Sequence, residues 1–223
     1  MNARTASIAV LLLLLPFALA CATAKPKASI AEREQTAIQM SGKLPEASMA
    51  NHQHMAGMSM PITVPPGALY TTADVQFMQG MIAHHAQAIH MSRLAASRGV
   101  NPRVLRFAMK IDQSQRAEIV LMQEWLVANK QMAPDTNSFR TMMMAGMLTP
   151  AQLTALEATR GAAFDRQFLV LMIQHHQGAL KMVADLLATP RAAQDVDISV
   201  FANDVEVVQT AEIALMQQML ADL

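Results

Sequence analysis

The stretch DVQFMQGMIAHHAQAIHM, residues 74–91, occurs a second time as DRQFLVLMIQHHQGALKM, residues 165–182. At an offset of 91 residues, nine of the eighteen positions are identical, and both histidines of a consecutive pair are among them. The similarity continues downstream, where residues 107–126 match residues 201–220 at ten of twenty positions with an offset of 94. Each repeat therefore reads as a helix pair, and two such pairs predict an all-α, four-helix bundle.

The helix ends are marked by capping residues and glycines. We expect a first helix from about residue 71 or 72 to Arg98, stopped by Gly99, and a second from Asn101 to about Lys130. A capping box at Thr149 starts a short connecting helix to about residue 160. The third helix covers about 162–188, and the fourth runs from about 195–197 to the end of the chain. The predicted domain is thus repeat 1 at about 71–130, a linker with a short helix at 131–161, and repeat 2 at about 162–223.

Composition limits the function classes. The chain has 223 residues, enough for one domain with a core and extensions, and its formal net charge is zero. No basic footprint for nucleic acid is visible, so we expect no nucleic-acid partner. The chain contains 20 methionines, which fill a core as soft apolar side chains or bind metals as thioethers.

Residues 1–20 resemble an export signal. Arg4 precedes an apolar run of twelve residues, which is short for a membrane span, and 18–20 read Ala-Leu-Ala, a small-x-small cleavage site. Cys21 follows directly and is the only cysteine, so we expect a periplasmic or cell-envelope protein, either lipid-anchored at Cys21 or simply cleaved. A membrane association is expected only through such an anchor. The domain then has no disulfide and no thiolate metal site.

Residues 21–70 read as a flexible tether that carries a short histidine- and methionine-containing tract. Imidazole with thioether suits copper, and thioether especially suits Cu(I). The alternative is a linker in which these residues occur by chance. The candidate ligands of this secondary metal tract are His52, His54, Met55, Met58 and Met60.

The motif histidines fall on the packing faces of their helices. Phe77, Met81, His84, Ala88 and Met91 follow one another at steps of four, three, four and three, which is one helix face. The next residue, His85, is therefore predicted at the edge of that face, and the third helix repeats the pattern with His175 and His176.

A glutamate lies within the otherwise apolar seam of each following helix. Glu118 and Glu212 occupy matching positions in the two repeats, and a buried carboxylate is costly unless it is paired or bound to a metal. The sequence thus predicts a shared polar site in the middle of the bundle. Its candidate metal ligands are His84, His85, His175, His176, Glu118 and Glu212, with Met81, Met172, Met122 and Met216 as nearby soft donors.

The alternative interpretation is that histidine–glutamate hydrogen bonds fix the helix register without a metal. Asp74 and Asp165, about two and a half turns before the histidines, are predicted to cap the helix starts or to act as a second shell that orients a ligand. His90 has no counterpart in the second repeat, where Lys181 stands, and is interpreted as a solvated surface residue.

The doubled pattern D-x-x-F-x-x-x-M-I-x-H-H-x-x-A-[IL]-x-M, with Q-x-x-E-I-x-x-M after each copy, resembles the bacterial domain-of-unknown-function 305 family. The resemblance extends over roughly residues 70–223, including the connection at 146–169. It implies a ferritin-like four-helix bundle that is exported in many bacteria and often associated with copper. Met219 stands where the first repeat has Trp125, a difference that affects no proposed ligand.

Three functions compete at this stage. The first is an extracytoplasmic copper-binding protein for sequestration, resistance or trafficking. Its expected ligand is Cu(I), and also Cu(II), with another transition metal as the alternative. A copper-trafficking protein is its expected partner. The second is a ferritin-like redox enzyme, which is disfavoured because di-iron bundles use four carboxylates and two Glu-x-x-His motifs and this chain has no such motif. The third is a metal-free scaffold or interaction module.

Overall fold

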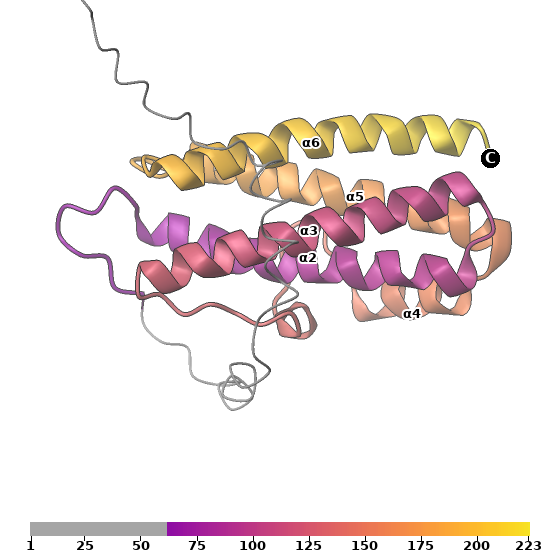
Figure 1. Cartoon of the computed structure of the whole chain (residues 1–223), viewed down its shortest axis with the longest axis horizontal. Helices are drawn as coiled ribbons and strands as arrows, with labels where there is room; N and C mark the ends of the chain where they lie inside the picture. The colour runs from indigo at the N-terminus through magenta and orange to yellow at the C-terminus, as the bar shows by residue number, and fades with distance from the viewer. Residues whose placement is uncertain (1–61) are drawn as a thin grey trace, which may run out of the picture.

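The computed structural model describes residues 62–223, and in this range the chain is all helical, without strands. The predicted fold class is confirmed. Four long helices and one short connecting α-helix follow in order, together with a single 3-10 turn (Figure 1). Their bounds are α2 Thr72–Arg98, α3 Pro102–Ala128, η2 Ser138–Arg140, α4 Pro150–Ala158, α5 Gly161–Leu187 and α6 Val196–Ala221.

The helix starts lie where the sequence places capping side chains. Thr71 forms a capping box with Asp74 at the start of α2, and Thr149 forms one with Gln152 at the start of α4. Asn101 caps α3 ahead of its first-position proline, and Asp195 caps α6. These side chains satisfy backbone N–H groups that a helix leaves unpaired, and the predicted boundaries accordingly agree with the observed ones within about three residues.

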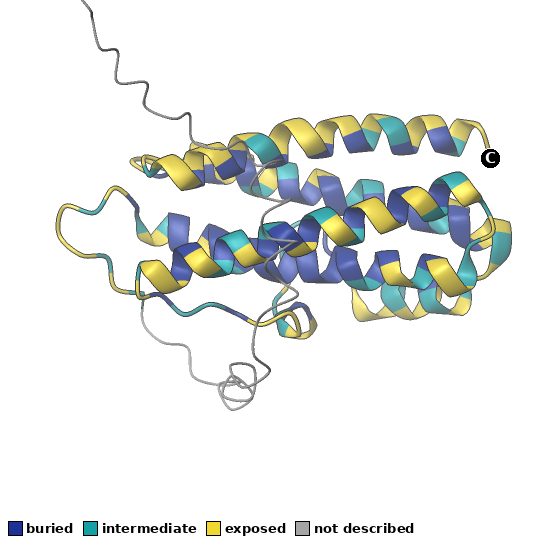
Figure 2. Ribbon diagram, in the orientation of Figure 1, coloured by how far each residue is buried: buried dark blue, intermediate teal, exposed yellow. Residues whose placement is uncertain are grey.

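The two helix pairs pack as the repeats predict. Helix α2 lies against α3, α5 lies against α6, and α2 and α5 also pack against each other (Figure 1). The motif-bearing helices of the two repeats thus meet in the centre of the bundle. The buried residues lie on the inward sides of all four long helices, and the exposed ones face outward (Figure 2).

The apolar core consists of two separate clusters. One gathers Phe77, Met81, Met122 and Phe201 with their neighbours, and the other gathers Phe107, Phe168, Met172 and Met216 with theirs. The four motif histidines belong to neither cluster, although all four have no exposed surface. A buried polar layer therefore accompanies the two apolar halves of the core.

A segment of the linker between the repeats crosses directly over α2 and α5. Gln87 of α2 donates from its side chain to the Leu148 carbonyl and accepts from the Leu148 backbone N–H. Gly146 has a φ of 75° and touches Gly178 of α5, where an added Cβ would lie only 2.0 Å from the Ala145 carbonyl oxygen. Two glycines are required here because the linker backbone lies directly on the helix.

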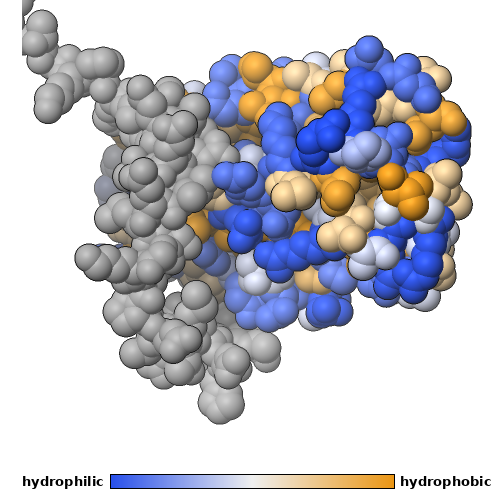
Figure 3. Space-filling view, turned by 45° about the vertical axis from the view of Figure 1, so that its right-hand side comes forward, coloured by the Kyte–Doolittle hydropathy of each residue, from blue (hydrophilic) through white to orange (hydrophobic). Residues whose placement is uncertain are grey.

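The surface of residues 62–223 is mixed in character. Hydrophilic and hydrophobic residues alternate on the face seen in Figure 3, and exposed apolar side chains such as Met109 and Val207 are distributed over several helices. Within residues 62–223, no helix has the length and apolar character needed to span a membrane.

Candidate metal centre

The centre of the bundle is a pair of histidines whose rings contact each other, one from each repeat. The ring centroids of His84 on α2 and His175 on α5 are 3.7 Å apart, with 43° between the ring planes. Both rings are completely buried. The Nε2 atom of His84 lies 3.1 Å from the carbonyl oxygen of Ala145 in the crossing linker. The equivalent ring of His175 has neither nitrogen in a side-chain or backbone hydrogen bond.

A histidine–glutamate pair flanks this contact in each repeat. His85 Nε2 lies 2.5 Å from Glu118 Oε2, and His176 Nε2 lies 2.8 Å from Glu212 Oε2. His85 was expected at the edge of the packing face, yet it is as fully buried as His84. The reason is that the neighbouring helix supplies a carboxylate that accepts the ring N–H, so that the face can include a second polar residue without an unpaired donor.

The central histidines are neutral at physiological pH. Burial, together with the charges of the neighbouring His85 and His176, lowers the pKa of His84 to about 3, against the opposing effect of the Ala145 carbonyl. The pKa of His175 is also held well below its usual range, first by burial and then by the charges of the other three motif histidines. Neutral imidazole is the form that binds metal ions, so these rings need lose no proton on binding.

Several buried polar atoms of this layer have no hydrogen-bond partner. Buried polar groups are normally paired, so a cluster of unpaired ones calls for a further polar partner such as water or an ion. Among these residues, Gln115 and Gln209 belong to the repeated Q-x-x-E pattern. The occurrence of glutamine at this position in both repeats is the sequence signal that could have included them in the site. The unpaired atoms are Nδ1 of His84, His85 and His176, both ring nitrogens of His175, and Oε1 of Gln115 and Gln209.

The residues fit a soft metal ion better than a hard one. Within the described residues, no three His, Cys, Asp or Glu side chains form a group that could hold a metal ion. Fully buried methionines do occur next to the polar layer: Met81 and Met172 lie one turn before His84 and His175 on their helices. Met122 and Met216 are also fully buried, one turn after the two glutamates. Imidazole with thioether is a donor set for Cu(I), whereas hard ions prefer oxygen cages.

The two aspartates lie away from the histidines. Asp74 accepts from the Thr71 backbone at the start of α2 and, at 2.7 Å, from Ala193 N in the loop between α5 and α6. Asp165 accepts from Val100 N and Asn101 N in the loop between α2 and α3. Each carboxylate thus ties the beginning of one motif helix to the loop of the other repeat.

The expectation that His90 is a solvated surface residue is wrong. Its Nε2 atom lies 2.8 Å from Glu157 Oε1 of α4, its side chain is 28% exposed, and its ring packs beside Phe139. Both partners come from the linker, whose path over α2 the repeat pattern does not reveal.

Some sequence-based predictions fall outside the described residues. They are the signal peptide, the lipid anchor at Cys21, and the secondary metal tract of His52, His54, Met55, Met58 and Met60.

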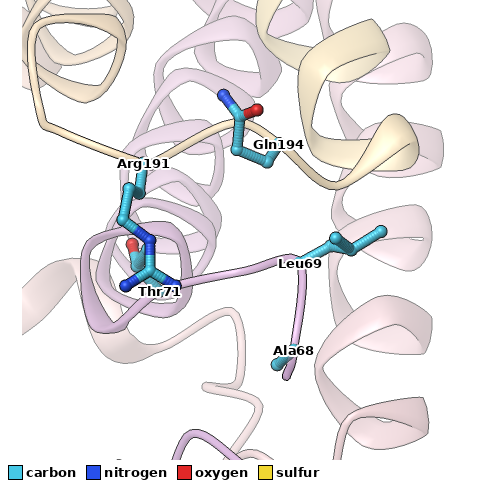
Figure 4. Close-up of a pocket in the computed structure, with 5 residues that line it drawn as sticks. All are labelled: Ala68, Leu69, Thr71, Arg191 and Gln194. Carbon is cyan, nitrogen blue, oxygen red and sulfur yellow. The ribbon is translucent and has the colours of Figure 1, made fainter. Parts of the chain in front are cut away.

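A shallow pocket occurs at one end of the bundle. It is lined by Ala68, Leu69, Thr71, Arg191 and Gln194, and Figure 4 shows the Arg191 side chain extending toward Thr71. Thr71 precedes His84 by 13 residues, which is about 20 Å along a helix. The pocket is therefore separate from the histidine layer.

Comparisons with known proteins agree on one family. A sequence profile described as "Domain of unknown function (DUF305)" matches residues 74–220. A DUF305 fragment from Deinococcus radiodurans has 31% identity and a TM-score of 0.60, covering 69% of this chain and 99% of that one. A DUF305 protein from Streptomyces coelicolor, provisionally described as secreted, has 28% identity and a TM-score of 0.60, covering 67% of this chain and 93% of that one.

The protein CopM is a further structural neighbour. Its Cu(II)-bound form has 28% identity and a TM-score of 0.55, and its Cu(I)-bound form has 29% identity and a TM-score of 0.53; in both cases 67% of this chain and 96% of CopM are covered. Silver-bound and apo forms of CopM match similarly. No curated protein sequence matches the chain.

Proposed function

Because the chain belongs to the DUF305 family, whose solved members include copper-bound CopM, we propose that it is an extracytoplasmic copper-binding protein. Its role would be sequestration, resistance or trafficking of copper, with a copper-trafficking protein as the partner that receives or delivers the ion. The residues of the bundle bind the metal, and the tract at residues 51–60 is a secondary site.

One observation carries this proposal: two neutral, fully buried imidazoles lie in close ring contact, and three of their four ring nitrogens have no hydrogen-bond partner. Leaving such groups unpaired in a core costs about 1–3 kcal/mol each. A metal ion bound to the lone-pair nitrogen of each ring would remove the part of this cost that belongs to those two nitrogens. His84 and His175 are therefore the proposed central ligands, and Met81 and Met172 are the nearest thioether candidates on the same helix faces.

The flanking pairs are proposed as the outer part of the same centre. His85 with Glu118 and His176 with Glu212 already hydrogen-bond through the histidine Nε2, so each ring can offer its unpaired Nδ1 to a metal without breaking the pair. Met122 and Met216 complete the set of candidate donors. In their hydrogen-bonded form the pairs fix the helix register and hold a negative charge close to the two central histidines.

The test is anaerobic titration of the full exported chain with Cu(I), with Zn(II) and Fe(II) as controls. We expect the double variant His84→Gln/His175→Gln to lose the copper bound in the bundle while circular dichroism remains helical. The control variant His90→Gln removes a histidine outside the repeated motif and should keep the wild-type stoichiometry. A deletion of residues 51–60 measures the tract separately. Unchanged stoichiometry in the double variant would refute the bundle site.

A metal-free interaction module is the second candidate. It is favoured by the two histidine–glutamate pairs, which are fully formed without a metal, and by the lack of a ready three-residue metal group in the described range. In that case copper would leave the thermal stability of the bundle unchanged. A copper-binding bundle would instead gain about 2.7 kcal/mol at a free metal concentration one hundred times the dissociation constant.

A further inference from the structure

The two halves of the histidine layer carry opposite charges at equivalent positions. The offset of 94 that relates α3 to α6 pairs Glu118 with Glu212 and also pairs Lys110 with Asp204. Lys110 extends from α3 to Glu212 of α6, where its Nζ lies 3.4 Å from Oε1. The pseudo-two-fold therefore places Asp204 of α6 opposite Glu118 of α3. One half thus has a cation beside its glutamate, and the other has a second carboxylate.

The exposure of the two glutamates follows this difference. The Glu212 side chain is 4% exposed, whereas the Glu118 side chain is 17% exposed. The contact with His176 and the charge of Lys110 lower the pKa of Glu212, although burial alone would raise it. Burial raises the pKa of Asp204, and the Glu118 carboxylate raises it further, which supports the proximity of these two acids.

We propose that a metal cation reaches the buried histidines past Glu118 and Asp204, and that Lys110 closes the equivalent route past Glu212. This inference rests on the proposed function, because it specifies how the same centre is loaded. Two neighbouring carboxylates attract a cation, while an ammonium group repels it and occupies the carboxylate that it would first meet.

Each repeat also has a buried amide between these charged positions in the sequence. Gln115 lies between Lys110 and Glu118 on α3, and Gln209 lies between Asp204 and Glu212 on α6. Both amides are buried and have an unpartnered carbonyl oxygen. These oxygens can replace hydration water as the ion leaves solvent, before it meets the imidazole nitrogens.

The experiment follows the rate of anaerobic Cu(I) binding to the full chain by quenching of Trp125, the only tryptophan. Trp125 lies seven residues beyond Glu118 on α3, about 10 Å along the helix. The kinetic phase of quenching that reports on the bundle is the one that is absent in the double variant His84→Gln/His175→Gln. At low ionic strength we expect Asp204→Lys to slow this phase by about tenfold.

Matched variants separate local charge from net charge. Glu206→Lys makes the same charge change on an exposed residue of the same helix and should alter the rate less than twofold. Lys110→Asp should accelerate binding, and Lys110→Met should do so to a smaller extent while keeping an apolar stem over Glu212. The double variant Lys110→Asp/Asp204→Lys exchanges the two charges and should restore the wild-type binding rate. In this background the rate should be reduced by Glu212→Gln, whereas in the wild type it should be reduced by Glu118→Gln.

The outcomes distinguish this inference from the proposed function. If the wild-type protein shows no kinetic phase that depends on His84 and His175, the copper site in the bundle and the entrance are both refuted. If the phase is present but Asp204→Lys and Glu206→Lys slow it equally, the entrance at Glu118 is refuted and the copper site stands. Failure of the charge exchange to restore the rate in folded protein refutes the entrance as well.

Discussion

Consecutive histidines in one helix have different chemistry here because their neighbours differ. His84 meets a backbone carbonyl and the ring of His175, so no negative charge compensates a proton on it. His85 meets the Glu118 carboxylate. The first residue is held neutral by burial, and the second has a partner that can balance a positive charge. A doubled histidine motif therefore supplies two kinds of imidazole rather than two copies of one.

This difference predicts that the metal-free protein loses stability in mild acid. The folded-state pKa of His84, about 3, and that of His175 lie below the unfolded value of 6.5, so the unfolded chain binds more protons between these limits. The free energy of unfolding should fall as the pH decreases below about 6.5, by up to about 1.4 kcal/mol per pH unit for each histidine. The low pKa of Glu212 adds to this loss only near and below its ordinary value of 4.5.

Urea unfolding at pH 7, 6 and 5 without metal measures the effect. His84→Gln should reduce the pH slope by the share of one histidine. A wild-type free energy of unfolding that is constant over this range would show that the central rings are not held neutral.

At the scale of the elements, the contact between the linker and α5 requires glycine on both sides, and Gly178 is the one inside the helix. A glycine-to-alanine change inside a free helix would stabilise it by about 1 kcal/mol. In Gly178→Ala the new Cβ would lie 2.0 Å from the Ala145 carbonyl oxygen and 2.5 Å from the Gly146 Cα, both of them backbone. We expect a net destabilisation of about 1–3 kcal/mol, because the linker must move off the helix.

The matched control is Gly80→Ala in α2. Its new Cβ would meet the Met144 Sδ at 2.9 Å and the Met182 Cε at 3.4 Å, which are flexible side-chain ends that can turn away. We expect a change within about 1 kcal/mol of wild type in urea unfolding. Equal destabilisation by both variants would contradict a specific role for the linker backbone at Gly178.

The helices could be predicted from the sequence more completely than their connections. The capping residues Thr71, Asn101 and Asp195 each lie within three residues of the backbone N–H groups that they bind. The local sequence therefore marks these helix starts. The linker contacts of His84 and His90 join positions about sixty residues apart, and helical periodicity carries no information on them. Periodicity identified the packing face that carries His84 and His175, but it placed the next histidine of each pair only at the edge of that face and did not reveal its glutamate partner.

At the scale of the whole molecule, the repeats are tied together reciprocally by two buried aspartates. Asp74 of repeat 1 accepts from the loop of repeat 2, and Asp165 of repeat 2 accepts from the loop of repeat 1. Gly99 is needed at the second contact, where an added Cβ would lie 2.7 Å from Asp165 Oδ1. The paired contacts lock the two helix pairs at opposite ends of α2 and α5.

Removing one of these carboxylates should destabilise the entire bundle. Asp165→Ala leaves the Val100 and Asn101 N–H groups without their acceptor, at about 1–3 kcal/mol for each that stays buried. Asp165→Asn keeps one oxygen and should recover part of the loss. The control Asp185→Ala breaks an exposed pair with Lys181 and should cost less than about 1 kcal/mol. Thermal or urea unfolding that ranks Asp165→Ala with Asp185→Ala would exclude this tie.

The carbonyl of Ala145 also sets the tautomer of the ring beneath it. A carbonyl oxygen can only accept a hydrogen bond, so neutral His84 must carry its proton on Nε2 and its lone pair on Nδ1. His175 makes no corresponding hydrogen bond to the linker, so the linker fixes the tautomer of only one of the two rings. A dimer of two identical helix pairs could not make this distinction without breaking its own symmetry. Fusing the pairs into one chain, with a linker that contacts only one ring, sets the proton position of one of two equivalent histidines and leaves the other without this constraint.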